Sequence, residues 1–409
     1  MKKLFLIICV SLVFFSACTE KDPDFEMHNQ IKSELQKLVD STYNNYLKTV
    51  PEYPGGISLK ITHDNYSYFV TSGFETSVTS SHHFRAASCT KTFTATAILL
   101  LHQQGKLNIE DYVNDLIPGT QEPYLPNNSS FDIPNKDSIR IIDLLRHRAG
   151  VFDVSNELIP DTISAKLPYK GHNYIEYVLK NEIGHTFSFD ELVKVVAETG
   201  LYYFKPDDSY HYSNTGYSLL GKIIERVSKE SYRDFLMNNI LKPMGLDDSF
   251  LAITGNEVDM PKPYVSGYKL YENLVYDVTK SNMSANVAEG NLTTTPDDLS
   301  RFISQLISGR GVLNTNALSL MTDCIPTGAS SSDKYGCGLS YMNNFGFGHT
   351  GAHEGYLSIM AYDPEIDFTI VAYTNTWNLN DDFNSLTKQF VELLGNVAVG
   401  SKAIIMNIE

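Results

Sequence analysis

The stretch Phe84-Arg85-Ala86-Ala87-Ser88-Cys89-Thr90-Lys91-Thr92-Phe93 places a serine and a lysine three residues apart in apolar surroundings. If the run from Lys91 to Gln104 is helical, both side chains leave the same face of the helix near its N-terminus. A serine hydroxyl is a weak nucleophile until a base takes its proton. A lysine amine can be that base only if burial or a nearby cation lowers its pKa from about 10.4. The stretch therefore predicts a nucleophilic Ser88 activated by a buried Lys91.

The Ser-x-x-Lys spacing alone is not diagnostic. It recurs at Ser266–Lys269, Ser331–Lys334 and Ser385–Lys388, so at least three of the four occurrences arise by chance. What distinguishes Ser88 is its apolar context and the motifs that follow it along the chain.

The N-terminus has the pattern of an export signal. Met1-Lys2-Lys3 is followed by an apolar run from Leu4 to Phe15 and then by Ser16-Ala17-Cys18, too short and wrongly flanked for a membrane span. We expect residues 1–18 to be a lipoprotein-type signal and lipobox with lipidation at Cys18; ordinary cleavage near Ala17 is the alternative. Residues 19–30 are then a tether. The prediction is an exported lipoprotein of the cell envelope, periplasmic or anchored in the outer membrane, which touches membranes through its lipid only.

Composition and charge narrow the function classes. The chain has 409 residues, 42% of them hydrophobic, which suffices for a large core, and a net charge of −16. An acidic exported protein is a poor candidate for binding nucleic acid. Cys324 and Cys337 could pair in an oxidising compartment, which the sequence leaves open. Beyond the signal, no apolar run is predicted to be long enough to cross a bilayer.

Strand patterns lie at both ends of the chain and helical patterns fill its middle. Apolar spacing predicts a helix over 31–47 and a strand hairpin over 57–71. Strands are predicted over 346–349, 356–362 and 368–375, and a closing helix over 383–394. Between them the predicted helices include 215–227, 232–241 and 296–308.

The economical fold is of the α/β (α+β) class. It is an antiparallel sheet built from both termini and flanked by helices, with an inserted, mostly helical region. The domain would span residues 31–395, with sheet regions at about 31–100 and 335–395 and the helical region at about 101–334. Residues 396–409 would form a C-terminal tail. An active site would lie in the cleft between the two regions.

Two further motifs carry groups that suit acyl transfer. Tyr212-Ser213-Asn214 precedes the predicted helix 215–227. A tyrosine phenol can relay a proton if a cation such as Lys91 lowers its pKa, and an asparagine amide can orient a substrate carbonyl and bond to the lysine. His349-Thr350-Gly351 begins a strand whose edge could pair with an extended, peptide-like ligand. There Gly351 would admit the ligand backbone, while Thr350 and a cationic or donor His349 would face a carboxylate.

In the order Ser-x-x-Lys, Tyr-x-Asn, His-Thr-Gly, the chain resembles the serine beta-lactamase/penicillin-binding-protein superfamily. The resemblance is to its branch of class C beta-lactamases, D-alanyl-D-alanine carboxypeptidases and related esterases and D-aminopeptidases, and it runs from about residue 50 to 395. Other matching blocks are Gly105-Lys106-Leu107, Leu144-Leu145-Arg146-His147, Pro243-Met244-Gly245-Leu246, Gly290 with Thr294-Thr295, Asp298-Leu299 and Gly355-Tyr356.

This resemblance implies a role for each candidate residue. Ser88 is the acylated nucleophile, and Lys91 and Tyr212 share the acid–base work in an order that stays open. Asn214, His349, Thr350 and Gly351 bind the substrate. The oxyanion hole is formed by the backbone N–H groups of Ser88 and Ala352, and neither a metal nor a cofactor is expected.

The resemblance also implies an activity. The substrate would be a small molecule or peptide (a D-Ala-D-Ala peptide, a beta-lactam or an ester). His349 stands where class C beta-lactamases usually have lysine, which favours a D-alanyl-D-alanine carboxypeptidase-like enzyme. A beta-lactamase, a carboxylesterase and a non-catalytic peptidoglycan or ligand sensor are the alternatives.

Overall fold

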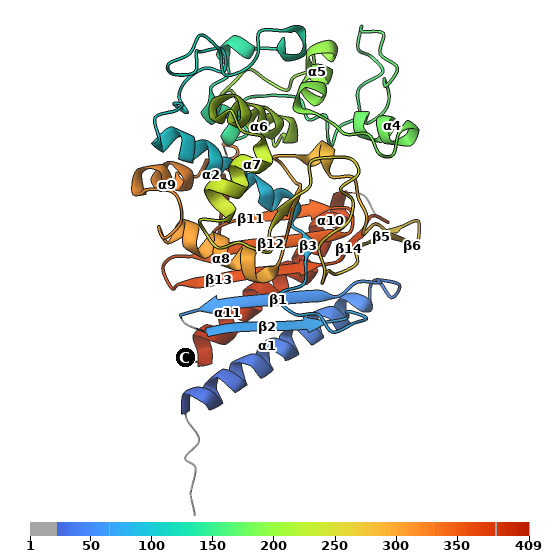
Figure 1. The fold of residues 1–409 in the computed structure, drawn as a ribbon. Coiled ribbons are helices and arrows are strands. Elements are labelled where there is room, and N and C mark those ends of the chain that lie inside the picture. Colours follow the sequence, from blue (N-terminus) through green and yellow to red (C-terminus); the bar gives the residue numbers. More distant parts are fainter. Residues whose placement is uncertain (1–22, 65, 330, 381–382, 409) are drawn as a thin grey trace, which may run out of the picture.

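The computed structural model describes residues 23–64, 66–329, 331–380 and 383–408. The predicted signal peptide, Cys18 and residues 19–22 of the predicted tether lie outside this range. A large antiparallel sheet crosses the middle of the molecule (Figure 1), with strand order β2-β1-β13-β12-β11-β10-β9-β8. The strands are β1 Ile57–His63, β2 Tyr66–Ser72, β8 Ile325–Pro326, β9 Lys334–Tyr335, β10 Ser340–Met342, β11 Gly346–His353, β12 Tyr356–Asp363 and β13 Phe368–Thr374. The prediction of one sheet built from both ends of the chain is confirmed.

The sheet is covered on both faces. Every residue of β12 and β13 is buried, which requires apolar side chains on both sides of the strands. Side chains alternate as the pleat demands: Leu357 and Ile359 pack toward the terminal helices, and Met360 packs toward the helical region. The middle of the sheet is therefore a rigid floor on which an active site can be built.

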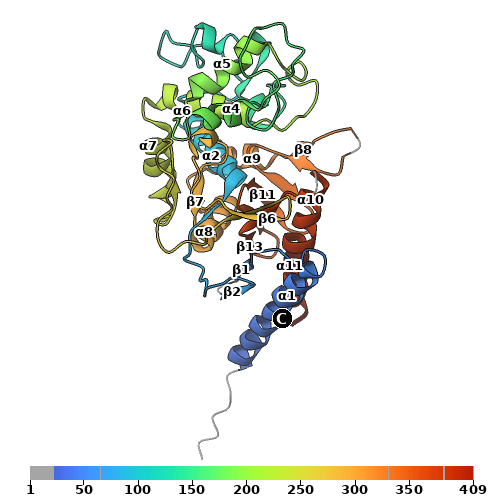
Figure 2. The ribbon, with the colours of Figure 1, turned by 90° about the vertical axis from the view of Figure 1, so that its right-hand side faces the viewer.

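Two terminal helices cover one face of the sheet. They are α1 Pro23–Leu47 and α11 Asn396–Ile408, which lie side by side (Figures 1 and 2). Two predictions are wrong here. Residues 23–30 of the predicted tether already belong to α1, and residues 396–408 of the predicted tail form α11. The reason is a helical spacing of buried side chains at Val397, Ser401 and Ile405 that packs against α1 and the sheet.

The C-terminal helical segment also corrects the expectation about membrane spans. Leu386–Ile408 is long and apolar enough to cross a membrane by length and composition. In the structure its residues Leu393, Leu394 and Val397 are buried in the same core as the sheet. Apolar composition here serves the packing of a terminal helix on the sheet.

The other face of the sheet carries the helical region, and α2 connects the two (Figure 2). Its helices are α2 Thr90–Gln103, α3 Ile141–Leu145, α4 Tyr174–Asn181, α5 Phe189–Thr199, α6 Asn214–Ser228, α7 Tyr232–Leu236, α8 Pro296–Ile307 and α9 Thr315–Thr322; α10 Phe383–Gln389 follows the sheet. Most of the predicted helices are present with small shifts of their ends.

The predicted helical region, about 101–334, also contains strands. Its strands β4, β5, β6 and β7 join β3 and β14, which lie outside this region, in two small sheets of order β3-β7-β4 and β14-β5-β6. These strands are β3 Phe84–Arg85, β4 Phe250–Leu251, β5 Tyr268–Tyr271, β6 Leu274–Asp277, β7 Leu292–Thr294 and β14 Thr376–Asn378. Helix α8 packs directly on β1, β12 and β13, so this part of the insertion belongs to the layer next to the sheet.

The assignment of α11 to the core predicts a specific loss of stability. Ile405→Ala should lower the free energy of unfolding by about 2–4 kcal/mol, because it empties a fully buried position beside α1. Met406→Ala is the matched control: the side chain of Met406 is 42% exposed, and we expect a change within about 0.5 kcal/mol. Urea denaturation of both variants measures this. Equal, small effects would mean that residues 396–408 do not pack stably on the sheet.

Candidate active site

Ser88 lies where the chain turns from β3 into α2. The one-turn helix η1, Ala87–Cys89, precedes α2, and from His83 to Leu101 only Ser88 is not buried. Ala87 has a φ of +49°, a left-handed conformation that is costly for a residue with a Cβ. The carbonyl oxygen of Ala87 accepts a hydrogen bond from Thr90 Oγ1 at 2.7 Å. A strained turn thus exposes one hydroxyl in an otherwise buried segment.

Lys91 is fully buried beside this hydroxyl, as predicted. Its Nζ lies 3.2 Å from Ser88 Oγ. It also donates to the backbone carbonyl of Glu289 at 2.8 Å and to the Glu289 carboxylate at 3.2 Å. Burial lowers the pKa of Lys91, and the charge of Glu289 opposes that shift. A buried amine with a lowered pKa can accept a proton from Ser88.

Tyr212 completes the group around Ser88. Its ring lies under the amine, with Lys91 Nζ 4.8 Å from the ring centroid, and its hydroxyl hydrogen-bonds Ser88. We expected Lys91 to lower the pKa of this phenol. Instead burial raises that pKa well above its ordinary value, and the carboxylates of Glu289 and Asp153 add to the rise. Tyr212 is therefore a neutral phenol, suited to donate a proton.

Asn214 is the first residue of α6, whose N-cap Ser213 accepts a hydrogen bond from the backbone N–H of Gly216. The predicted bond between Asn214 and Lys91 is not formed, because Glu289 and Ser88 take the contacts of the amine. The side-chain oxygen of Asn214 is buried and has no hydrogen-bond partner among the described residues. Such a group is open to an N–H of a ligand.

The outer edge of β11 faces Ser88. Strand β10 pairs with only Gly346 to Gly348 of β11, which leaves His349 to His353 without a strand on that side in the described part of the chain. Close packing places this edge beside the nucleophile: Cys89 Sγ lies 3.6 Å from the carbonyl oxygen of His349. The free edge is what an extended ligand would need. Thr350 is exposed there.

Gly351 allows two segments of the chain to approach closely. A Cβ at this position would lie 2.2 Å from the carbonyl oxygen of Ala86. Glycine is therefore needed so that β11 can approach the turn that carries Ser88. Ala352 lies on β11 and Ser88 on η1, and these two elements are in contact.

His349 is held in the neutral state, which corrects the expectation of a cation. Its Nδ1 donates to the carbonyl oxygen of Thr350 at 2.5 Å, so Nε2 carries no proton and accepts from the Tyr335 hydroxyl at 2.9 Å. Burial and the charge of Lys91 lower the pKa of His349 to about 3. Both ring nitrogens are occupied, and His349 cannot offer a charge or a donor to a carboxylate.

The sequence analysis missed several residues that line this site. Glu289 and Asp153 are buried carboxylates near Lys91. The ring of His147 lies 4.2 Å from that of Tyr212, and its Nδ1 accepts from the backbone N–H of Ser213. Single carboxylates at these positions have no spacing in the sequence that links them to Ser88. Cys89 is buried as well, and burial raises the pKa of its thiol to about 12.

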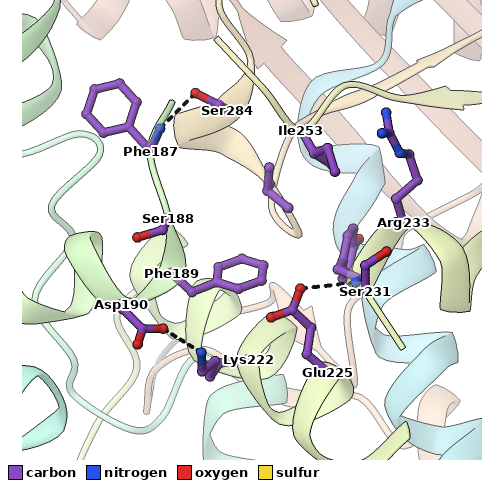
Figure 3. A pocket seen from close by; sticks show the side chains of 12 residues that line it. Phe187, Ser188, Phe189, Asp190, Lys222, Glu225, Ser231, Arg233, Ile253 and Ser284 are labelled. Carbon is purple, nitrogen blue, oxygen red and sulfur yellow. Dashed lines mark hydrogen bonds and ion pairs between the residues drawn. The ribbon is translucent and has the colours of Figure 1, made fainter. Parts of the chain in front are cut away.

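A separate hollow of about 220 Å³ lies between α5, α6 and α7 (Figure 3). Phe189, Glu225 and Tyr232 line it, and none of the predicted site residues does. Thr94 links its wall to the segment before Glu289, because it contacts the Tyr232 hydroxyl and the carbonyl of Ala288. The hollow is therefore distinct from the group around Ser88.

Fold and site together define the class: a serine hydrolase of the beta-lactamase/transpeptidase-like fold. The chain belongs to the Beta-lactamase family, whose model matches residues 48–392.

Curated relatives and solved structures agree with this class. Penicillin-binding protein 4* of Bacillus subtilis is 26% identical over 298 residues, covering 68% of this chain and 57% of the relative. Protein flp of Staphylococcus aureus is 26% identical over 331 residues, covering 78% of this chain and 57% of the relative. The chain thus spans little more than half the length of these relatives.

Two solved structures share the fold over most of their length. The D-amino acid amidase from Ochrobactrum anthropi SV3 complexed with L-phenylalanine has a TM-score of 0.69 at 25% identity, covering 93% of this chain and 99% of that one. A D-stereospecific amidohydrolase from Streptomyces sp. has a TM-score of 0.69 at 24% identity, covering 90% and 99%.

The neutral state of His349 predicts a pH dependence of stability. The folded chain does not protonate His349 until about pH 3, whereas the unfolded chain does so near pH 6.5. Between these values the unfolded state binds more protons, so stability falls as the pH falls. Moving from pH 7.5 to pH 5 should cost the wild type about 2 kcal/mol more than His349→Asn. Urea denaturation at both pH values measures the difference, and parallel losses would show a histidine that titrates normally in the folded protein.

Proposed function

We propose that this protein forms an acyl-enzyme on Ser88 and hydrolyses it with water. The contact between Lys91 Nζ and Ser88 Oγ at 3.2 Å, in a buried setting, carries the proposal. Ser88 Oγ attacks the substrate carbonyl carbon while its proton passes to the amine of Lys91. The leaving amine or alcohol then takes a proton from the acid–base pair Lys91 and Tyr212, and the neutral phenol of Tyr212 is suited to donate it. Water then repeats the attack on the acyl-enzyme and frees the acid and Ser88.

The backbone N–H groups of Ser88 and Ala352 are the proposed oxyanion hole. They would stabilise the negative charge that forms on the carbonyl oxygen during each attack. The free edge of β11 would hold an extended substrate beside them, with Asn214 oriented by its place at the start of α6.

Among acyl donors, the geometry favours those without a carboxylate next to the scissile bond. His349 is neutral and fully hydrogen-bonded, and the buried carboxylates Glu289 and Asp153 lie nearby. A substrate carboxylate would therefore find no free cation at this wall and would be repelled. We propose D-aminoacyl amides or esters as the preferred class. The similarity to a D-amino acid amidase supports this choice.

A D-alanyl-D-alanine carboxypeptidase is the second candidate. The unpaired edge of β11 suits a peptide in extended conformation, and one of the relatives is a penicillin-binding protein of Bacillus subtilis. Hydrolysis of beta-lactams or of simple carboxylic esters would use the same acyl-enzyme chemistry.

Location in the cell envelope is also a proposal, and it rests on residues 1–18 of the sequence. Lipidation of Cys18 predicts that metabolic labelling with a fatty acid marks the full-length protein when it is expressed in a bacterium. The label should be lost in Cys18→Ser. An unlabelled wild type would favour ordinary signal cleavage near Ala17.

Acylation is tested by measuring the intact mass of residues 19–409 after brief incubation with a D-phenylalanine ester. Turnover is measured separately as the release of product from D-phenylalanine amide. We expect Ser88→Ala to lose both the adduct and at least about 10³-fold of the turnover, because Ser88 supplies the aliphatic hydroxyl in contact with the Lys91 amine. Thr90→Ser, a buried hydroxyl on the same turn, is a control that should retain turnover. Turnover that survives Ser88→Ala would contradict the proposed mechanism.

In the same assay, His349→Lys tests the substrate class. A lysine there supplies the missing cation, so acylation by penicillin and cleavage of a D-Ala-D-Ala peptide should rise relative to D-phenylalanine amide by about tenfold. An unchanged ratio would show that His349 does not decide between substrates with and without a carboxylate.

A further inference from the structure

Glu289 is a buried carboxylate in direct contact with Lys91. Its side chain is 3% exposed. One carboxylate oxygen, Oε2, lies 3.2 Å from Lys91 Nζ, and the other, Oε1, accepts from Asn286 Nδ2 at 2.6 Å. The backbone carbonyl of Glu289 accepts a second hydrogen bond from Lys91 at 2.8 Å. One residue therefore contacts the amine twice.

The backbone holds Glu289 in place. The helix η5, Ser284–Asn286, ends three residues before it, and the N–H groups of Glu289 and Gly290 both donate to the carbonyl of Asn286. Strand β7, Leu292–Thr294, then fixes the chain beside β3 and the turn that carries Ser88. The two acceptors for Lys91 are thus placed by the fold and not by a mobile side chain alone.

These two contacts orient the amine. A neutral lysine amine has four tetrahedral positions: one bond to its carbon, two N–H bonds and one lone pair. If the two N–H bonds point at the carbonyl and the carboxylate of Glu289, the remaining position is the one that faces Ser88 Oγ at 3.2 Å. A base must present its lone pair to the proton that it takes.

We propose that Glu289 is a positioning residue that aims the lone pair of Lys91 at Ser88 and stabilises the ammonium formed when Lys91 takes the serine proton. The inference rests on the acyl-enzyme function proposed above. In this step the O–H bond of Ser88 breaks and an N–H bond forms on Lys91. The new positive charge then lies next to the Glu289 carboxylate until the proton passes to the leaving group. Glu289 acts through Lys91, because its side chain is buried and its carboxylate oxygens contact Lys91 and Asn286.

Other titratable groups surround the Lys91 amine, and their charges also affect its pKa. Asp153 contributes a second negative charge, and its own pKa is raised to about 7 by burial and by Glu289. The buried rings of His147 and His349 have lowered pKa values, and those of Tyr212 and Tyr217 have raised ones. These four rings are therefore uncharged at neutral pH, and Cys89 is a neutral thiol. Glu289 is the carboxylate in direct contact with Lys91.

The experiment follows the reactivity of Ser88 rather than any particular substrate. The rate at which a fluorophosphonate probe labels Ser88 is measured from pH 5 to pH 10 in the wild type, in Glu289→Gln and in the control Glu225→Gln. Glu225 is a half-buried carboxyl on the wall of the separate hollow (Figure 3). The three proteins are also measured with the additional substitution Asp153→Asn, so that the titration of Asp153 is not mistaken for that of Lys91.

We expect Glu289→Gln to move the labelling inflection to lower pH by about one unit or more, because a lost negative charge disfavours the ammonium. The limiting rate at high pH should fall about tenfold, since the ammonium that forms is no longer stabilised. Glu225→Gln should match the wild type. A role in folding alone would lower the melting temperature without moving the inflection. An inflection pH within about 0.3 units of the wild-type value, a difference on the order of the assay error, would therefore overturn the proposal.

Two further outcomes are decisive. If Glu289→Gln does not fold, Asn286→Ala replaces it. This variant removes the donor to Glu289 Oε1 and should shift the inflection in the same direction by a smaller amount; no shift would again overturn the proposal. If the wild type is not labelled at Ser88 at any pH, the acyl-enzyme function fails, and the role of Glu289 fails with it. Labelling that is lost in Ser88→Ala but unaltered in Glu289→Gln rejects the role of Glu289 alone.

Discussion

A lysine amine that has been removed from water is the constraint on which the rest of this site depends. Burial makes the ammonium unfavourable and the free amine available, but it also requires that every N–H of that amine find a partner. The protein meets both demands with one residue, whose backbone carbonyl and carboxylate receive Lys91. The remaining contact of the amine is the hydroxyl of Ser88. The position of the base therefore follows from how its own hydrogen bonds are satisfied.

The sheet and its neighbouring turn convert this buried pair into an accessible site. The chain before Ser88 adopts a left-handed conformation at Ala87, and the edge of β11 comes so close that only glycine fits at residue 351. These two features lift one hydroxyl out of a buried segment and place it beside an unpaired strand edge. Strain of this kind persists because the sheet behind it is buried on both faces.

The tautomer and the burial of His349 decide the charge of the wall opposite Ser88. A histidine in this position is cationic only if it keeps access to water or to a carboxylate. Here Tyr335 and the backbone of Thr350 occupy both ring nitrogens, and the neighbouring Lys91 disfavours a second positive charge. The wall is polar but uncharged. The same fold that supports acyl transfer thus selects among acyl donors through one hydrogen-bond network.

The order of the three motifs in the sequence was enough to predict the family, the fold class and the group Ser88, Lys91 and Tyr212. The reason is that residue types and their spacings within a motif can be read directly from the sequence. Apolar periodicity also located most helices and the strands of the sheet. It could not show that residues 23–30 and 396–408 are packed helices, because these two helices pack on each other from opposite ends of the chain. Nor could it assign Glu289 to Lys91, the neutral state to His349 or the raised pKa to Tyr212. Protonation and hydrogen bonding in a buried site depend on which distant segments surround a group, and only the tertiary structure decided that.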